Sequence, residues 1–352
     1  MAENTVENKK LIETIVWRCP SNIAIVKYWG KKENQLPCNS SLSMTLSKAF
    51  TEIELTLHQK KTKDAIELDF FFEGKKNVQF QERVKKYFSA QAKDFSFLKE
   101  FAVSINSHNS FPHSAGIASS ASAFGAIALS ICDVLRTLRK QTINEDFFRK
   151  ASELARLGSG SACRSMYGDF VLWGKNNAIA NSSDEFAIPV TDIHENFKNF
   201  HDAILIVEKE PKKVSSSVGH SLMNNHPFAE NRFLQADKRV ERLKTVLSSG
   251  DLSEFIHIAE SEALTLHAMM MTSEDYYLLM KSGTLIAIEK IIEFRKETKI
   301  PVCFTLDAGP NVHVLYPGSE KNKVELFLNN MIGNSVKEII FDQIGDGPQK
   351  IR

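Results

Sequence analysis

The 352 residues carry 44 lysines and arginines against 43 aspartates and glutamates, so no overall charge draws the chain to nucleic acid or to an anionic membrane surface. A hydrophobic fraction of 43% and a charged fraction of 25% are typical of a globular protein, and the length allows two ordinary domains. We therefore expect any basic site to be local and its partner to be a small molecule.

The N-terminus and the cysteines bear on the cellular compartment that we expect for the protein. The first ten residues are polar and lack an apolar core, so we expect no secretory signal. We also expect no apolar run long enough to span a bilayer. The cysteines are scattered without a CxxC pair, which favours reduced thiols in a cytoplasmic protein, with neither disulfides nor a zinc site. The five cysteines are Cys19, Cys38, Cys132, Cys163 and Cys303.

Apolar periodicity predicts a mixture of strands and helices in the N-terminal half. Alternation at every second residue indicates strands, and a spacing of three to four residues indicates helices with one buried face. Asn144 is placed to cap the helix that follows it. In order, we predict strands at 15–18, 23–28, 44–58 and 65–72, helices at 78–92, 119–138 and 145–157, and a strand at 170–173.

The periodicity of apolar residues changes after a polar interval at residues 176–184. Beyond this interval, most of the longer segments are predicted to be helices. Strands followed by helices and further strands argue for an α+β architecture in two lobes. We place the lobe boundary near residue 190, which gives lobes 1–190 and 191–352. In order, we predict a strand at 203–207, helices at 227–247, 252–271 and 276–298, strands at 302–306 and 312–316, a helix at 320–331 and a strand at 336–340.

One small-residue loop opens directly into the helix predicted after residue 118. It contains Pro112 and Gly116 and ends in Ser119 and Ser120. The first N–H groups of a helix lack partners within it and carry partial positive charge, so this position suits a phosphate group. The alternative is a plain capped helix in which Ser119 or Ser120 serves only as the N-cap.

A basic cluster follows the second predicted strand. Lys27, Lys31 and Lys32 lie beside the hydroxyl of Tyr28, and such a group of donors can hold phosphate oxygens. The alternative is an exposed strand end with solvated lysines. Trp29 next to Gly30 argues against full exposure.

The segment Gly158–Ser165, with the sequence GSGSACRS, surrounds one arginine with glycines and serines. Backbone N–H groups and hydroxyls are exposed in such a loop, and the guanidinium of Arg164 can hold a carboxylate or phosphate by two parallel bonds. The alternative is a flexible connection with Arg164 at the surface.

An aspartate leaves a predicted buried strand in the segment Thr305–Val312, with the sequence TLDAGPNV. Asp307 could accept the N–H groups of its own turn and have no chemical role. It could instead be a carboxylate within reach of a substrate hydroxyl. Its local sequence leaves both interpretations open.

Together these motifs resemble the kinase superfamily of galactokinase, homoserine kinase, mevalonate kinase and phosphomevalonate kinase, and within it the diphosphomevalonate decarboxylases. The superfamily loop Pro-x-x-x-Gly-Leu-Gly-Ser-Ser-Ala is matched with Ile117 for the leucine and Ala118 for the second glycine, the latter being typical of the decarboxylases. The decarboxylase strings Asn-Ile-Ala-x-x-Lys-Tyr-Trp-Gly-Lys, Gly-Ser-Gly-Ser-Ala-Cys-Arg-Ser and Asp-Ala-Gly-Pro-Asn also match, and the resemblance extends from Val16 to about Tyr316. His113 departs from the pattern, and we assign it no role.

The resemblance implies a two-lobed small-molecule kinase superfamily fold, with an N-terminal lobe like domain 2 of ribosomal protein S5 and a ferredoxin-like C-terminal lobe. It also implies a homodimer. The implied reaction uses ATP and Mg²⁺ to decarboxylate (R)-5-diphosphomevalonate to isopentenyl diphosphate. Sister activities remain open, namely a mevalonate 3-kinase or a decarboxylase of 5-phosphomevalonate, as does a non-catalytic binding protein that retains the fold.

The resemblance also assigns roles residue by residue. Asp307 would orient or deprotonate the C3 hydroxyl, Arg164 would hold the carboxylate, and Lys27 would complete the catalytic group. The diphosphate would be held by Lys27 as well, together with Tyr28, Lys31, Ser159 and Ser161. No metal ligand is assigned. The residues expected to bind ATP are Pro112, Gly116, Ile117, Ala118, Ser119 and Ser120.

Overall fold

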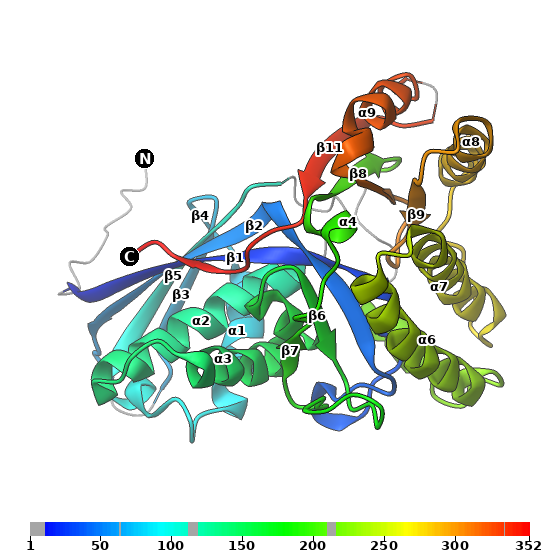
Figure 1. Cartoon of the computed structure of the whole chain (residues 1–352). Helices are drawn as coiled ribbons and strands as arrows, with labels where there is room; N and C mark the ends of the chain where they lie inside the picture. The colour runs from blue at the N-terminus through cyan, green and yellow to red at the C-terminus, as the bar shows by residue number, and fades with distance from the viewer. Residues whose placement is uncertain (1–10, 63–64, 112–118, 210–215, 334) are drawn as a thin grey trace.

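The computed structural model describes residues 11–62, 65–111, 119–209, 216–333 and 335–352. Within them the chain forms two sheets with helices against each, as the predicted two-lobed α+β architecture requires (Figure 1). The expected ATP-binding residues Pro112, Gly116, Ile117 and Ala118 lie outside the described residues, and so does His113.

The first sheet forms the N-terminal lobe, with the order β12-β1-β2-β5-β3-β4; in addition, β6 pairs with β2, and β7 pairs with β6. β1 runs without interruption through Pro20, where we predicted two separate strands. The chain then returns from the second lobe to add β12 beside β1 (Figure 1). The strands are β1 (Leu11–Val26), β2 (Ser41–Gln59), β3 (Leu68–Phe72), β4 (Lys75–Lys76), β5 (Phe101–Asn109), β6 (Phe170–Trp173), β7 (Ala187–Pro189) and β12 (Gln349–Lys350).

Three helices cover one face of this sheet (Figure 1). The N-terminus of α1 is capped by Asn77, which accepts a hydrogen bond from the N–H of Phe80 at 2.9 Å. Asn144 caps α3 as predicted, accepting from the N–H of Phe147 at 3.0 Å. The helices are α1 (Val78–Ala90), α2 (Ser119–Arg139) and α3 (Glu145–Gly158).

The central helix α2 corrects one expectation. By length and composition it is apolar enough to cross a membrane, so our expectation that no such run exists is wrong. In the structure 83% of its apolar window is buried, because the helix packs against β1, β2 and α3. Its apolar character therefore matches its place in the core of the lobe.

The second sheet belongs to the C-terminal lobe and has the order β11-β8-β10-β9. α7, α8 and α9 pack against its strands, and α6 and α7 also pack against each other and against β1 of the first sheet (Figure 1). Its strands are β8 (Phe200–Ile206), β9 (Cys303–Thr305), β10 (Val312–Pro317) and β11 (Glu338–Gln343). Its helices are α4 (Glu195–Lys198), α5 (Ser216–Ser221), α6 (Ala229–Ser249), α7 (Leu252–Thr272), α8 (Ser282–Thr298) and α9 (Lys321–Asn329).

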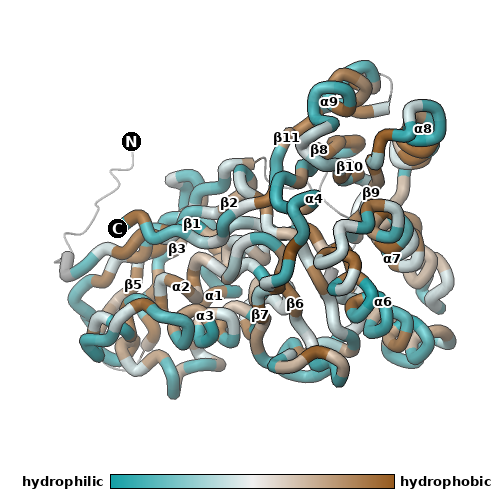
Figure 2. Tube along the Cα trace, viewed as in Figure 1, coloured by the Kyte–Doolittle hydropathy of each residue, from teal (hydrophilic) through white to brown (hydrophobic). Residues whose placement is uncertain are grey.

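One hydrophobic core joins the two lobes. Side chains of β1, β2 and β6, such as Ile23 and Phe170, pack in the same cluster as Phe200 of β8 and Val240 of α6. Hydrophilic residues gather on the outer sides of α3 and α6, as Figure 2 shows. Because burial of apolar area is the main stabilising term, this shared core couples the orientation of the lobes to their stability.

Candidate active site

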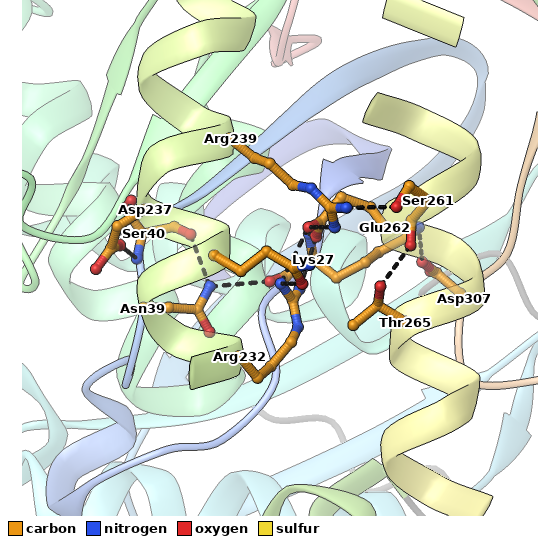
Figure 3. A network of polar contacts seen from close by, with 11 residues as sticks. Lys27, Asn39, Ser40, Arg232, Asp237, Arg239, Ser261, Glu262, Thr265 and Asp307 are labelled. Carbon is orange, nitrogen blue, oxygen red and sulfur yellow. Dashed lines mark hydrogen bonds and ion pairs between the residues drawn. The ribbon is translucent and has the colours of Figure 1, made fainter. Parts of the chain in front are cut away.

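The centre of the site is an ion pair between the lobes. Lys27 directly follows β1, and Asp307 is the second residue beyond β9. The Lys27 Nζ lies 3.1 Å from Asp307 Oδ1, with the lysine side chain 2% exposed and the aspartate side chain 27% exposed (Figure 3). The carboxylate is therefore accessible from one side while a buried cation supports it from the other.

The backbone of Lys27 is held by an ionic network that the sequence did not indicate. Its N–H donates to Glu262 Oε2 at 2.8 Å, and its carbonyl accepts from Asn39 Nδ2 at 2.9 Å (Figure 3). Glu262 is fully buried on α7 and pairs with Arg232 at 2.6 Å and with Arg239 at 2.7 Å. The site lysine is thereby fixed to helices of the other lobe.

Asp307 is likewise held by its backbone. Its carbonyl accepts the N–H of Gly309 at 2.7 Å and the Nε2–H of His267 at 3.1 Å. The local turn thus uses the main chain of Asp307, while the carboxylate pairs with Lys27. Burial lowers the pKa of Lys27, and the neighbouring Asp307 and Glu262 oppose that shift.

Arg164 lies in a buried cradle of neutral oxygens, so the surface interpretation of this residue is wrong. Its Nη1 donates to Ser41 Oγ at 2.7 Å, and its Nε donates to Ser43 Oγ at 3.1 Å and to Asn22 Oδ1 at 3.3 Å. Burial lowers its pKa, and Asp307 is close enough to oppose that shift. Among the described residues the guanidinium hydrogen-bonds to no carboxylate, so its charge can serve an anionic ligand.

Tyr28 faces the loop after α3. Its ring packs edge-on against Trp173 at 4.7 Å, and its buried hydroxyl has no hydrogen-bond partner among the described residues. A Cβ at Gly160 would lie 2.8 Å from that hydroxyl, so only glycine allows this approach. Because a buried hydroxyl without a partner is costly, it is suited to binding a ligand oxygen.

The serines of two separate motifs meet at the start of α2. Ser119 and Ser120 are its first two residues, and Ser120 Oγ lies 3.3 Å from Ser159 Oγ. Ser161 accepts a hydrogen bond from Asn22 through its carbonyl, which ties its loop to β1. The first N–H groups of α2, which have no partners within the helix itself, therefore lie beside the loop that carries Arg164.

A cavity of about 270 Å³ opens beside Ser119 and Ser120. It is also lined by Arg83 of α1, whose guanidinium lies 4.7 Å above the ring of Phe124. Partial burial lowers the pKa of Lys31, and the nearby charge of Arg83 lowers it further. Arg83 was not among the residues predicted from the sequence, although it follows Phe80 by three residues on the same helix.

No group of three or more His, Cys, Asp or Glu side chains suited to a metal ion occurs within the described residues. Mg²⁺ is commonly held by one or two carboxylates together with substrate phosphates rather than by a protein cage. The open carboxylate of Asp307 and the hydroxyls at the start of α2 fit that kind of site.

The fold and this site define a two-lobed enzyme of the small-molecule kinase superfamily, in which a helix N-terminus of the kind that suits phosphate groups lies near a buried lysine, an accessible aspartate and a buried arginine. Comparisons with known proteins agree. The model of the diphosphomevalonate decarboxylase-like N-terminal domain matches residues 19–187. The model of the mevalonate 5-diphosphate decarboxylase C-terminal domain matches residues 203–335.

Individual relatives span nearly the whole chain. Diphosphomevalonate decarboxylase of Saccharomyces cerevisiae is 30% identical over 333 residues, which cover 90% of this chain and 81% of the relative. The crystal structure of mevalonate diphosphate decarboxylase from Staphylococcus aureus has a TM-score of 0.84 and 30% identity, and the match covers 97% of this chain and 98% of the other. A structure of MDDEF in complex with MVAPP, AMPPCP and magnesium has a TM-score of 0.81 and 27% identity, with 96% and 99% covered. The chain belongs to the diphosphomevalonate decarboxylase family.

Proposed function

We propose that this protein converts (R)-5-diphosphomevalonate and ATP to isopentenyl diphosphate, ADP, phosphate and CO₂. The observation that carries the proposal is the accessible carboxylate of Asp307 on the buried Lys27, with the buried cation of Arg164 close by. A carboxylate that can take a proton and a guanidinium that can hold a second carboxylate are what this reaction needs. Members of the same family carry the name of this activity.

The first step activates the C3 hydroxyl, because hydroxide is a poor leaving group. Asp307 accepts the hydroxyl proton while the oxygen attacks the γ-phosphorus of ATP, so the bond to ADP breaks and a C3 phosphate ester forms. Lys27 holds the Asp307 carboxylate at 3.1 Å in an orientation that faces the substrate. Such positioned proton transfer contributes typically about 10²–10⁴-fold to a rate.

The second step releases phosphate and CO₂. The C3–O bond breaks with its electron pair on the leaving phosphate, the electrons of the C1–C2 bond form the C2–C3 double bond, and C1 leaves as CO₂. Arg164 orients the C1 carboxylate through its guanidinium, which Ser41 and Ser43 hold in place. Because the guanidinium is already oriented, little reorganisation is needed during the reaction.

The remaining residues bind the two phosphate-bearing molecules. Tyr28, Lys31, Ser159 and Ser161 anchor the diphosphate, whose binding energy positions C3 for reaction. Mg²⁺ supplies charge neutralisation for the ATP phosphates. In support, a family member has been solved with MVAPP, AMPPCP and magnesium together. The ATP phosphates are held by the loop and helix start comprising Pro112, Gly116, Ile117, Ala118, Ser119 and Ser120.

The test is a coupled ADP-release assay that offers mevalonate, its 5-phosphate and its 5-diphosphate separately, with CO₂ detected in parallel. We expect turnover of the diphosphate with equal amounts of ADP and CO₂. Release of ADP without CO₂ would make the protein a 3-kinase, and preference for the 5-phosphate would make it the monophosphate decarboxylase. No turnover with any of the three would support the binding-protein alternative.

We further propose a cytoplasmic homodimer that associates with neither nucleic acid nor membrane. The net charge of +1 supports the absence of a nucleic-acid partner, and the family resemblance suggests the dimer. Light scattering during size-exclusion chromatography tests it directly. A mass of about 40 kDa, close to the 39.7 kDa of one chain, would rule it out.

A further inference from the structure

His220 of α5 lies beside the site, and it belongs to none of the motifs described above and has no role in the proposed mechanism. Its ring packs at 4.3 Å from the ring of Tyr28 and at 4.7 Å from that of Trp29, measured between centroids. It is 8% exposed. Burial among these rings, reinforced by the charges of Lys31 and Arg164, lowers its pKa to about 3. The imidazole is therefore neutral at physiological pH.

The hydrogen bond of the ring fixes which nitrogen carries the proton. The N–H of Gly30 donates to Nδ1 at 3.0 Å, so Nδ1 is unprotonated. A neutral imidazole with an accepting Nδ1 must carry its proton on Nε2. Gly30 itself has a φ of +93°, a left-handed conformation that directs this N–H and favours glycine.

The donor on Nε2 is not used within the described residues. Nε2 hydrogen-bonds to none of them and is not among their fully buried unpartnered atoms, so it remains accessible. Besides Trp29 and Gly30, the ring has Tyr28, Lys31 and Arg164 nearby, and these last residues are all assigned to substrate anions. An N–H donor placed among cations and an unpartnered hydroxyl fits an anionic oxygen.

We propose that the Nε2–H of His220 is a further substrate-binding donor, which hydrogen-bonds to an oxygen of the diphosphate group beside Tyr28 and Lys31. The inference rests on the proposed function, since it places the diphosphate at these residues. A neutral donor strengthens the anion site without adding a third positive charge next to Lys31 and Arg164. The role of His220 is thus in binding rather than in the chemical steps.

Two substitutions of His220 distinguish the Nε2–H donor from the Nδ1 acceptor that bonds to the N–H of Gly30. His220→Asn retains an acceptor near Nδ1 and removes the Nε2 donor, whereas His220→Gln places an amide donor near Nε2. We expect His220→Asn to raise the KM for 5-diphosphomevalonate about tenfold with little change in kcat, because one hydrogen bond to a charged group is lost. We expect His220→Gln to remain within about threefold of the wild type.

A matched control uses His226, a second buried histidine close to His220 in the chain. His226 is 7% exposed, and both its ring nitrogens bond to protein groups, namely the Met269 carbonyl and the Phe228 N–H. His226→Asn is expected to lower the melting temperature without changing the KM for 5-diphosphomevalonate. An unchanged KM in His220→Asn, or equal increases in His220→Asn and His220→Gln, would overturn the donor role.

A spectroscopic measurement on the wild-type protein tests the same proposal without depending on whether the variants fold. With ¹⁵N-labelled histidine, titration with inorganic pyrophosphate and then with 5-diphosphomevalonate is expected to shift the Nε2 resonance of His220 while Nδ1 stays unprotonated. No shift at saturation would refute the inference. If the wild type lacks turnover, the proposed function fails separately and the pyrophosphate titration alone decides the role of His220.

Discussion

Lys27 and Asp307 differ in exposure because their positions in the chain differ. Lys27 is the first residue beyond a long buried strand and is surrounded by Glu262 and Asn39, whereas Asp307 enters a turn. A buried lysine without a counter-charge would lose much of its proton affinity, and Asp307 offsets this loss. The pair therefore keeps a cation at the base of the site with its carboxylate open to substrate.

The first prediction concerns Asp307→Asn, which keeps the shape of the side chain and removes its charge. We expect kcat to fall by about 10³-fold, because proton acceptance from the C3 hydroxyl is lost, with a smaller effect on KM. Steady-state ADP and CO₂ release measure both constants. Asp94→Asn, at an exposed aspartate, is the control, and a wild-type kcat in Asp307→Asn would remove this residue from the mechanism.

The second prediction is a pH dependence that arises from His220. Its pKa is about 3 in the folded protein against an ordinary value of 6.5, so between these values the unfolded chain binds more protons. Stability must therefore fall as the pH drops from 6.5 towards 3, by up to about 1.4 kcal/mol per pH unit. The cations Lys31 and Arg164 face the ring and act in the same direction.

Urea unfolding of the wild type and of His220→Gln at pH 7, 6 and 5 measures this contribution. The wild type is expected to lose more stability than the variant over this range, since glutamine does not titrate. Parallel curves for the two proteins would contradict the prediction.

At the scale of elements, α6, α7 and the end of β1 are joined by one buried carboxylate. Glu262 serves as the shared acceptor for Arg232, Arg239 and the N–H of Lys27, and Arg239 also donates to Ser261 (Figure 3). Removal of one partner from a buried ion pair commonly costs about 3–5 kcal/mol, because the remaining charge is left uncompensated.

The third prediction is that Glu262→Ala lowers the free energy of unfolding by about this amount and also lowers kcat. The kinetic loss follows because Lys27 loses its backbone acceptor. Chemical denaturation and steady-state kinetics give the two values. Glu260 lies on the same helix as Glu262, and Glu260→Ala breaks its more exposed pair with Arg295 of α8, so a smaller loss of stability is expected there. Equal losses would show that burial of Glu262 has no special effect.

Most elements could be predicted because their apolar periodicity is local. The prediction was least accurate where distant partners decide the structure. β1 continues through Pro20 because the strand is paired on only one side at this residue. β12 pairs only with Trp17 and Arg18, so Pro20 has β2 as its one neighbouring strand, and the pairing with β2 is irregular just beyond it. α8 begins at Ser282 rather than at Tyr276, and the hydroxyl of Thr284 accepts the N–H of Lys281 at that start.

Site residues could be predicted from the sequence only where they belong to short, recognisable motifs. Tyr28, Lys31, Ser159, Ser161 and Arg164 could be named in advance, although their assigned roles remain predictions. The Glu262 network and His220 could not be found in this way. A buried glutamate or histidine on a helix has no local pattern that distinguishes it from an exposed one, and its partners lie far away in sequence.

For the whole molecule, the relative placement of the lobes depends on contacts made near the end of the chain. Asp342 of β11 accepts the N–H groups of Ser47, Lys48 and Ala49 at 2.8–3.1 Å, and these residues belong to β2 in the other lobe. Asp342 is 1% exposed. One carboxylate therefore satisfies three backbone donors across the lobe boundary.

The fourth prediction is that Asp342→Ala destabilises the whole protein by about 3 kcal/mol, because the buried N–H of Ala49 and the partly buried N–H groups of Ser47 and Lys48 lose their acceptor. We also expect a lower kcat, since Lys27 and Asp307 come from different lobes. Differential scanning calorimetry with kinetics tests both effects. Lys48→Ala removes only an exposed bond to the Phe341 carbonyl across the same boundary and should change little. A melting temperature unchanged by Asp342→Ala would refute the idea.

The return of β12 to β1 also has a consequence for synthesis on the ribosome. Trp17 and Arg18 leave the exit tunnel long before Gln349 and Lys350, their partners in the sheet. Lys350 then pairs with the buried Asp133 of α2 at 2.8 Å. One edge of the sheet in the N-terminal lobe therefore stays unpaired until translation of the second lobe is finished. We therefore expect chaperones to bind to that edge in nascent chains that are stalled within the second lobe.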